Sequence, residues 1–339
     1  MFPKPSTSPK KRLFMQFTRR HTLKFAGISC AATALAGALR AEGDPPAASA
    51  GTALPFALTT PMHVSQAALR VRDLDPMIDY YRSVLGLNEV ARNARGVTLG
   101  AGTVPLLDLV HKPTADYESP TSAGLFHIAY LMPTRKDLAR WLVHAALRQV
   151  PLTGFADHNV SEAVYLNDPE GNGIEVYSDR PKDTWVWSGS VVKMGTEPLD
   201  VDDLVTLTDT KKSDYEAAPS GMRIGHIHLR VGEIATARAF YEEAVGLKPT
   251  QDARSDASFL SSGGYHHHLA VNTWNSRGAK ERNATETGLD WFSLAIKNPT
   301  DLEAQKTRLR AAGYVLVEME NKVVEAIDPW GTRLRLVPV

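Results

Sequence analysis

Asp168-Pro169-Glu170-Gly171-Asn172-Gly173-Ile174-Glu175 ends the first half of this sequence, and Asp328-Pro329-Trp330-Gly331 repeats its turn near the end of the second half. Other motifs recur at the same spacing of 160 positions, from 168 to 328. They are Leu69-Arg70-Val71 with Leu229-Arg230-Val231, Tyr80-Tyr81 with Phe240-Tyr241, and Gly86-Leu87 with Gly246-Leu247. A constant spacing indicates internal duplication. We therefore predict two homologous halves, at residues 63–180 and 222–339, joined by a linker at 181–221.

Each half contains one structural pattern twice. In the first half, a strand-like run at 64–72 precedes an amphipathic helix from Pro76 to Leu85, which ends near Gly86, and a strand pair follows at 97–109. The order then repeats, with a strand at 125–131, a helix at 136–149, and strands at 163–166 and 173–177. We therefore predict an α+β protein of four βαβββ modules, two per half.

The composition is that of an ordinary folded protein. The 339 residues are 43% hydrophobic and 22% charged, which is enough to bury a core in more than one domain. Basic and acidic residues each number 38, so no net charge favours nucleic acid or an anionic membrane. A small molecule is therefore the expected partner.

The N-terminal segment resembles an export signal. Basic residues up to Arg20 precede an apolar run from Phe25 to Leu39, which is too short to span a bilayer. Within it, Thr18–Lys24 resembles a twin-arginine signal, which sends folded proteins across the membrane to the periplasm. An ordinary secretory signal is the alternative.

We predict a signal peptide at 1–41, a flexible leader at 42–62, and no stable membrane span after processing. Cleavage after residue 38, 41 or 50 fits the pattern, and both Met1 and Met15 are compatible with the true start. Processing would remove Cys30, the only cysteine. The mature protein would then have no thiolate ligand, so His, Asp or Glu would have to hold any metal.

Three further stretches resemble a known superfamily. They are Gly225-His226-Ile227-His228-Leu229, Gly264-Tyr265-His266-His267-His268-Leu269, and Asp157-His158 through Tyr177. Together with the Asp-Pro-x-Gly turns, they resemble the two-domain catechol 2,3-dioxygenases of the vicinal oxygen chelate superfamily. The resemblance covers nearly everything after residue 63. It implies that the modules form two incomplete β-barrels, because two modules build each metal barrel in this superfamily.

The resemblance also implies a metal site. In the superfamily, one module gives a His from its first strand, and the other gives a His from its first strand and a Glu from its last. His127 and Glu175 occupy these positions in the second module, and His226 does so in the third. Two imidazoles and one carboxylate are the facial set of non-haem Fe(II) oxygenases. The implied cofactor is therefore Fe(II), and Mn(II) suits the same ligands.

The other ligand positions carry residues of different chemistry. Gln66 stands at the first module's position, and Trp291 and Arg335 stand at the fourth module's positions. Arg335 would bring a permanent positive charge. Taken singly, a strand His or Glu is more often a surface or core residue. The three together predict a site across the two halves, with a metal-free barrel formed by the first and fourth modules.

Three more residues match family positions beside the metal. His267 matches the acid/base His, and an imidazole suits proton transfer because its ordinary pKa is ~6.5. Tyr165 matches the Tyr that hydrogen-bonds the substrate oxygen, and His158 matches a His of the same pocket. Strand alternation would place His267 on the face opposite His266 and His268.

The resemblance implies an extradiol dioxygenase, which would insert O2 into a catechol-like ring next to its vicinal diol. A glyoxalase-like lyase or isomerase is an alternative, although such enzymes usually need a fourth protein ligand. A non-enzymatic small-molecule-binding protein of the same fold is another, although it would not need metal ligands. The fold alone does not decide among these functions, and the sequence is compatible with a homo-oligomer.

Overall fold

A computed structural model of the chain describes residues 54–339. The predicted signal peptide and most of the predicted leader therefore lie outside the described residues. The last residues of the expected flexible leader are part of the fold, because they form α2 (Phe56–Thr59) and the start of β1. Ala57 of this helix is fully buried.

The first half contains two βαβββ modules, which confirms the predicted pattern. Module one consists of β1 (Met62–Val71), α3 (Leu74–Leu85), β2 (Asn88–Asn93), β3 (Gly96–Ala101) and β4 (Val104–His111). Module two consists of β5 (Gly124–Leu131), α4 (Arg135–Leu147), β6 (Leu152–Asp157), β7 (Ser161–Asn167) and β8 (Gly173–Asp179). Helix α3 ends at Gly86, which has a left-handed φ of 70° that glycine adopts without strain.

The second half repeats the pattern, and several of its elements are shorter. Module three consists of β11 (Arg223–Arg230), α6 (Ile234–Arg238), the π-helical η2 (Ala239–Ala244), β12 (Lys248–Pro249), β13 (Ala257–Ser261) and β14 (Leu269–Asn272). Module four consists of β15 (Gly288–Ile296), α7 (Pro299–Ala311), β16 (Leu316–Glu318), η3 (Glu320–Lys322), β17 (Val324–Ile327) and β18 (Arg333–Pro338). Between the halves lie η1 (Lys182–Thr184), β9 (Trp187–Ser188), β10 (Val191–Val192) and α5 (Val201–Val205).

The module strands form two eight-stranded mixed sheets, and each sheet takes one module from each half. One has the order β12-β13-β14-β11-β5-β8-β7-β6, and the other has the order β16-β17-β18-β15-β1-β4-β3-β2. Strand β5 pairs antiparallel with β11, and β1 pairs antiparallel with β15. Modules two and three therefore share a sheet, as do modules one and four, which is the predicted pairing. Neither of these two sheets closes into a complete barrel.

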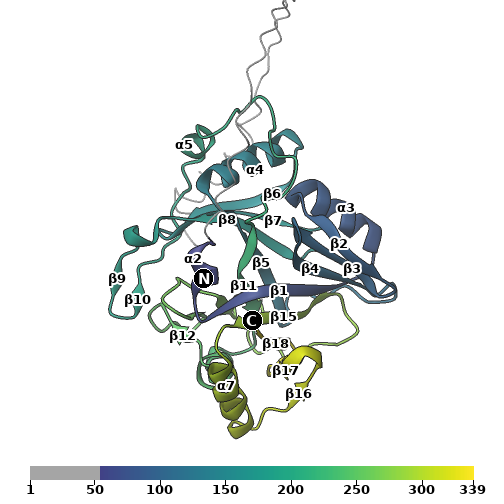
Figure 1. Cartoon of the computed structure of the whole chain (residues 1–339), viewed down its shortest axis with the longest axis vertical. Coiled ribbons are helices and arrows are strands. Elements are labelled where there is room, and N and C mark those ends of the chain that lie inside the picture. Colours follow the sequence, from purple (N-terminus) through teal and green to yellow (C-terminus); the bar gives the residue numbers. More distant parts are fainter. Residues whose placement is uncertain (1–53) are drawn as a thin grey trace, which may run out of the picture. The chain divides into compact units, whose positions relative to one another are not determined.

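The two sheets meet at their central strands, where β1 contacts β11 and β5 contacts β15 (Figure 1). One continuous apolar cluster joins all four modules, with large buried side chains such as Met77, Trp141, Phe240 and Phe292. In residues 54–339, no helix has the length and apolar character needed to cross a membrane.

Candidate metal centre

Three buried side chains converge on the sheet formed by modules two and three. His127 lies on β5, Glu175 on β8 and His226 on β11. The register places Ala129 of β5 opposite both Glu175 and His226. His127 precedes Ala129 by two positions and so shares its face of the sheet. Strand register therefore brings together residues from both halves of the chain.

The donor atoms lie at separations that suit one metal ion. Oε2 of Glu175 is 3.0 Å from Nε2 of His127 and 3.2 Å from Nε2 of His226, and the two nitrogens are 3.4 Å apart. Ligand bonds of about 2.1 Å at right angles would place neighbouring donors about 3 Å apart. Within residues 54–339, no other group of three or more His, Cys, Asp or Glu side chains has such spacing. The residues therefore fit a bound metal cofactor.

The protonation states of this group also suit metal binding. Burial tends to raise the pKa of Glu175, but the charge and hydrogen bonds of His226 and His127 hold this pKa well below its ordinary value. Burial lowers the pKa of His226 to about 4, although Glu175 opposes the shift. At neutral pH the site therefore presents a carboxylate and a neutral imidazole, which are the forms that ligate metals.

His267 lies beside the donor group, with its ring centroid 4.1 Å from that of His226. It is not on a strand, because residues 265–268 form no strand and β14 begins at Leu269. The prediction that strand alternation separates His267 from His266 is therefore wrong, and their Nδ1 atoms are 2.8 Å apart. Burial lowers the pKa of His267 well below its ordinary value, so its ring is neutral at pH 7.

Tyr165 and His158 form a hydrogen-bonded pair next to Glu175. Tyr165 on β7 lies opposite Glu175 in register, and its hydroxyl is 2.7 Å from Nε2 of His158. Nδ1 of His158 is 2.6 Å from the carbonyl oxygen of Gly195, which can only accept. In a neutral ring, Nδ1 then carries the proton and Nε2 accepts from Tyr165. Burial and the charge of Glu175 raise the pKa of Tyr165 well above its ordinary value, so Tyr165 keeps its proton.

The linker between the halves helps to position His158. Gly195, which accepts the hydrogen bond from His158, belongs to this linker. The backbone of Glu197 pairs with that of Asp157, next to His158 in the sequence. The predicted linker is therefore more than a connection, since its backbone contributes to the site.

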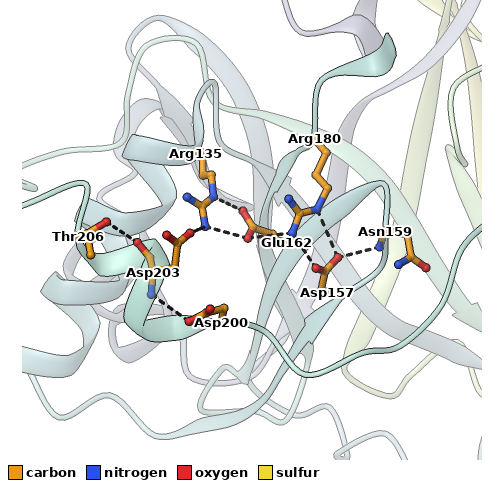
Figure 2. Close-up of polar contacts among 8 residues, drawn as sticks. All are labelled: Arg135, Asp157, Asn159, Glu162, Arg180, Asp200, Asp203 and Thr206. Atoms are coloured by element: carbon orange, nitrogen blue, oxygen red, sulfur yellow. Dashed lines mark hydrogen bonds and ion pairs between the residues drawn. The ribbon is translucent and has the colours of Figure 1, made fainter. Parts of the chain in front are cut away.

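An ion-pair network lies next to the turn that carries His158 (Figure 2). Arg180 is 2.7 Å from Asp157 and 3.2 Å from Glu162, and Arg135 joins Glu162 to Asp203 of α5. Only 3% of the Glu162 side chain is exposed. The turn that carries His158 is therefore held between β7, α4 and the linker.

Three residues near the donor group, Asp179, Tyr177 and Gly195, were not predicted from the sequence. Asp179 and Tyr177 follow Glu175 on β8 at intervals of two positions, so strand alternation could have placed them on the same face. Tyr177 can lie beside His226 because residue 225 is glycine. A Cβ at position 225 would be 1.7 Å from the Tyr177 hydroxyl. Gly195 acts through its carbonyl group, for which residue type gives no signal.

The equivalent positions of the other sheet carry a different group. The Arg335 guanidinium lies 4.0 Å from the centroid of the Trp291 ring. Both residues line a cavity of about 210 Å³ together with Asp108, which accepts a hydrogen bond from Gln66 at 2.9 Å. In the described part of the chain, these positions therefore offer a permanent cation in place of a ligand.

Comparison with known proteins agrees with this architecture. Residues 63–176 and 223–333 match the Glyoxalase/Bleomycin resistance protein/Dioxygenase superfamily. A catechol-2,3-dioxygenase of Bacillus subtilis (strain 168) is 36% identical over 264 residues, which are 76% of this chain and 91% of that protein. This homology supports a dioxygenase or glyoxalase-like function.

Solved structures show the same fold. A candidate dioxygenase of Bacillus subtilis has a TM-score of 0.56 at 13% identity, over 82% of this chain and 86% of that one. Glyoxalase I of Zea mays has a TM-score of 0.50 at 16% identity, over 84% of this chain and 94% of that one. These likenesses concern the fold alone. Because the family match covers most of both halves, the chain belongs to the Glyoxalase/Bleomycin resistance protein/Dioxygenase superfamily.

Proposed function

We propose that this chain is a non-haem Fe(II)-dependent extradiol dioxygenase, which inserts O2 into a catechol-type ring next to its vicinal diol. The observation that carries the proposal is the convergence of His127, Glu175 and His226, with His267 beside them. The similarity to a catechol-2,3-dioxygenase supports this reaction over others of the superfamily.

The three donors suit a metal that must also bind two small molecules, the diol substrate and O2. Held by His127, Glu175 and His226, Fe(II) would supply Lewis acidity and a template for the diol and O2, and Mn(II) suits the same donors. A metal held by three protein donors would have room for both the diol and O2. In the described residues, the group includes no fourth His, Cys, Asp or Glu donor, which supports a dioxygenase over a glyoxalase-like lyase.

The surrounding residues would manage the protons and the orientation of the substrate. His267, neutral because of its burial, would accept a proton from a catechol hydroxyl. Tyr165 donates a hydrogen bond to His158 and keeps its proton, so its oxygen lone pairs are available to accept from the substrate's other hydroxyl. His158, fixed by Gly195, would hold that oxygen in place.

Oxygen consumption tests the proposal. Protein purified anaerobically and loaded with Fe(II) should bind about one ion per chain and consume O2 with a catechol, giving a yellow ring-fission product. Glu175→Gln is the matched control, because it preserves the shape of the side chain and removes the charge of the donor. Metal-replete protein that consumes no O2 with any of a panel of catechols would overturn the proposal in favour of a lyase or a binding protein.

We also propose export by the twin-arginine route, which rests on Arg19 and Arg20 of the sequence. That route carries folded proteins, so iron could be loaded before transport. Changing both residues to Lys should leave the protein in the cytoplasmic fraction. Unchanged recovery from the periplasm would contradict the proposal.

A further inference from the structure

A chain of hydrogen bonds leads from His267 away from the metal donors. Nδ1 of His267 is 2.8 Å from Nδ1 of His266, and Nε2 of His266 is 3.0 Å from Oδ1 of Asp179. The Tyr265 hydroxyl donates to the same carboxylate oxygen at 3.1 Å. Asp179 ends β8, which also carries Glu175. The acid/base candidate is therefore connected to a carboxylate through one imidazole.

The carboxylate sets the direction of both hydrogen bonds. The Asp179 carboxylate oxygen accepts, so His266 donates from Nε2. With its proton on Nε2, the His266 ring has an acceptor at Nδ1, so His267 donates from its own Nδ1. The second nitrogen of His267, Nε2, is then unprotonated. Nε2 of His267 has no hydrogen-bond partner among residues 54–339, so it is available to accept from a substrate.

The surroundings of His266 favour this fixed arrangement. The side chain of His266 is fully buried, and its ring centroid lies 4.0 Å from that of Tyr265 and 5.2 Å from that of Trp185. The ring of Phe56 on α2 lies 5.9 Å from that of Trp185 and 6.0 Å from that of Tyr265. Hydrogen bonds are stronger where water is excluded. The aromatic shell therefore protects the bonds that orient His267.

We propose that His266 and Asp179 are positioning residues, which keep a proton on Nδ1 of His267 and turn its Nε2 lone pair toward the substrate. This inference rests on the proposed function and deepens it. A catechol O–H bond would break, its electron pair would stay on oxygen, and a new N–H bond would form at Nε2. His266 would continue to accept the hydrogen bond from Nδ1 of His267. Asp179, through its hydrogen bond with His266, would stabilise the imidazolium that forms at His267. No proton has to move to Asp179.

The tautomer of His267 can be measured directly. Nitrogen-15 NMR of the metal-free full chain, labelled at histidine, separates protonated from unprotonated ring nitrogens. The His267 signals are assigned by their loss in His267→Gln. We expect a protonated Nδ1 and an unprotonated Nε2. A cationic His266 would reverse this pattern, because it would donate from both nitrogens, and a protonated Nε2 on His267 would overturn the proposal.

Two variants of His266 test its positioning role. His266→Asn places an amide oxygen near the position of Nδ1 and should keep the tautomer, whereas His266→Phe offers no acceptor and should lose it. With a catechol, His266→Phe should lower kcat by about 10- to 100-fold and leave KM nearly unchanged, since general acid/base catalysis contributes ~10²- to 10⁴-fold in total. An unchanged tautomer in His266→Phe would overturn the proposal.

Two variants of Asp179 provide a second test in case His266→Phe does not fold. Asp179→Asn retains an oxygen acceptor and should retain the wild-type tautomer of His267. Asp179→Ala has no acceptor and should no longer fix this tautomer. If Asp179→Ala shows the wild-type tautomer, Asp179 has no positioning role. The tautomer is measured without metal or substrate, so its result is independent of whether the protein cleaves catechols.

Discussion

The Nε2 atoms of His127 and His226 lie 3.4 Å apart, although 99 positions separate the two residues in the sequence. The separation is short because β5 and β11 are antiparallel neighbours that come from different halves of the chain. Neither half contains the full donor set, since Glu175 accompanies His127 and only His226 comes from the second half. The candidate donor group therefore forms only when the two halves share a sheet.

The roles of His267 and His268 should separate cleanly. His267→Ala should retain the metal and lose about 10²- to 10⁴-fold in kcat, because it removes the proton acceptor. His268 is fully buried, with its ring nitrogens 3.1 Å from the Ser261 hydroxyl and 3.0 Å from the Ala57 carbonyl oxygen. His268→Ala should lower the free energy of unfolding by about 1–3 kcal/mol and spare turnover. Metal content, kcat and urea unfolding measure the three effects. Loss of turnover in His268→Ala with normal turnover in His267→Ala would contradict this account.

Tyr165 and His158 should act as a unit. Tyr165→Phe removes the hydroxyl that lies 2.7 Å from His158, and His158→Gln removes the ring that orients it. Each single change should lower kcat by roughly 10-fold or more, and the double change should cost little beyond the larger single effect. The four rates of the double-mutant cycle measure this coupling. Fully additive losses would show that His158 does not act through Tyr165.

The network around Glu162 should contribute to stability. Glu162→Gln leaves Arg135 and Arg180 without their shared carboxylate, and this carboxylate is 3% exposed. The arginines are about one-third exposed, so we expect a loss of about 1–3 kcal/mol in the free energy of unfolding, below that of a fully buried pair. Glu89→Gln, in the exposed pair with Arg92, is the control and should leave stability unchanged. Equal effects of the two changes in urea unfolding would refute the structural role.

Asp168 should make stability depend on pH. Burial raises its pKa to about 6, against hydrogen bonds from Asn172 and Tyr81. The folded chain then binds the proton more tightly than the unfolded chain, so the stabilisation is complete below pH ~3.9 and is lost as the pH rises through about 6. The difference in unfolding free energy between wild type and Asp168→Asn should fall by roughly 2–3 kcal/mol from pH 4 to pH 7. Denaturant unfolding at several pH values measures it, and a constant difference would exclude this shift.

Much of the fold was predictable because duplication is visible in residue types. The repeated turns at Asp168 and Asp328 defined the halves, and alternating apolar residues located most strands of the first half. The family resemblance gave the candidate ligand positions, and Gln66, Trp291 and Arg335 at the remaining positions left modules two and three as the source of the donors. These residues also predicted that modules two and three share a sheet, which the strand order confirms.

The parts that were missed depend on backbone geometry and tertiary contacts. Gly263 and Gly264 have left-handed φ values of 64° and 76°, and their turn keeps the three histidines off β14. The Gly-Gly pair was a signal against extending that strand. Helix α2 lies in a segment with the composition of a leader, and the contacts of Phe56 with Trp185 and Tyr265 stabilise it. Such contacts have no local signature.

Anomalous diffraction from crystals of the Fe(II)-loaded chain tests the cross-half site most directly. Data collected on both sides of the iron absorption edge would distinguish iron from other ions. We predict one iron peak per chain, bound by His127 and Glu175 from the first half and by His226 from the second, at about 2.0–2.2 Å from each donor. An iron peak elsewhere, or one whose protein ligands all come from a single half, would contradict the account.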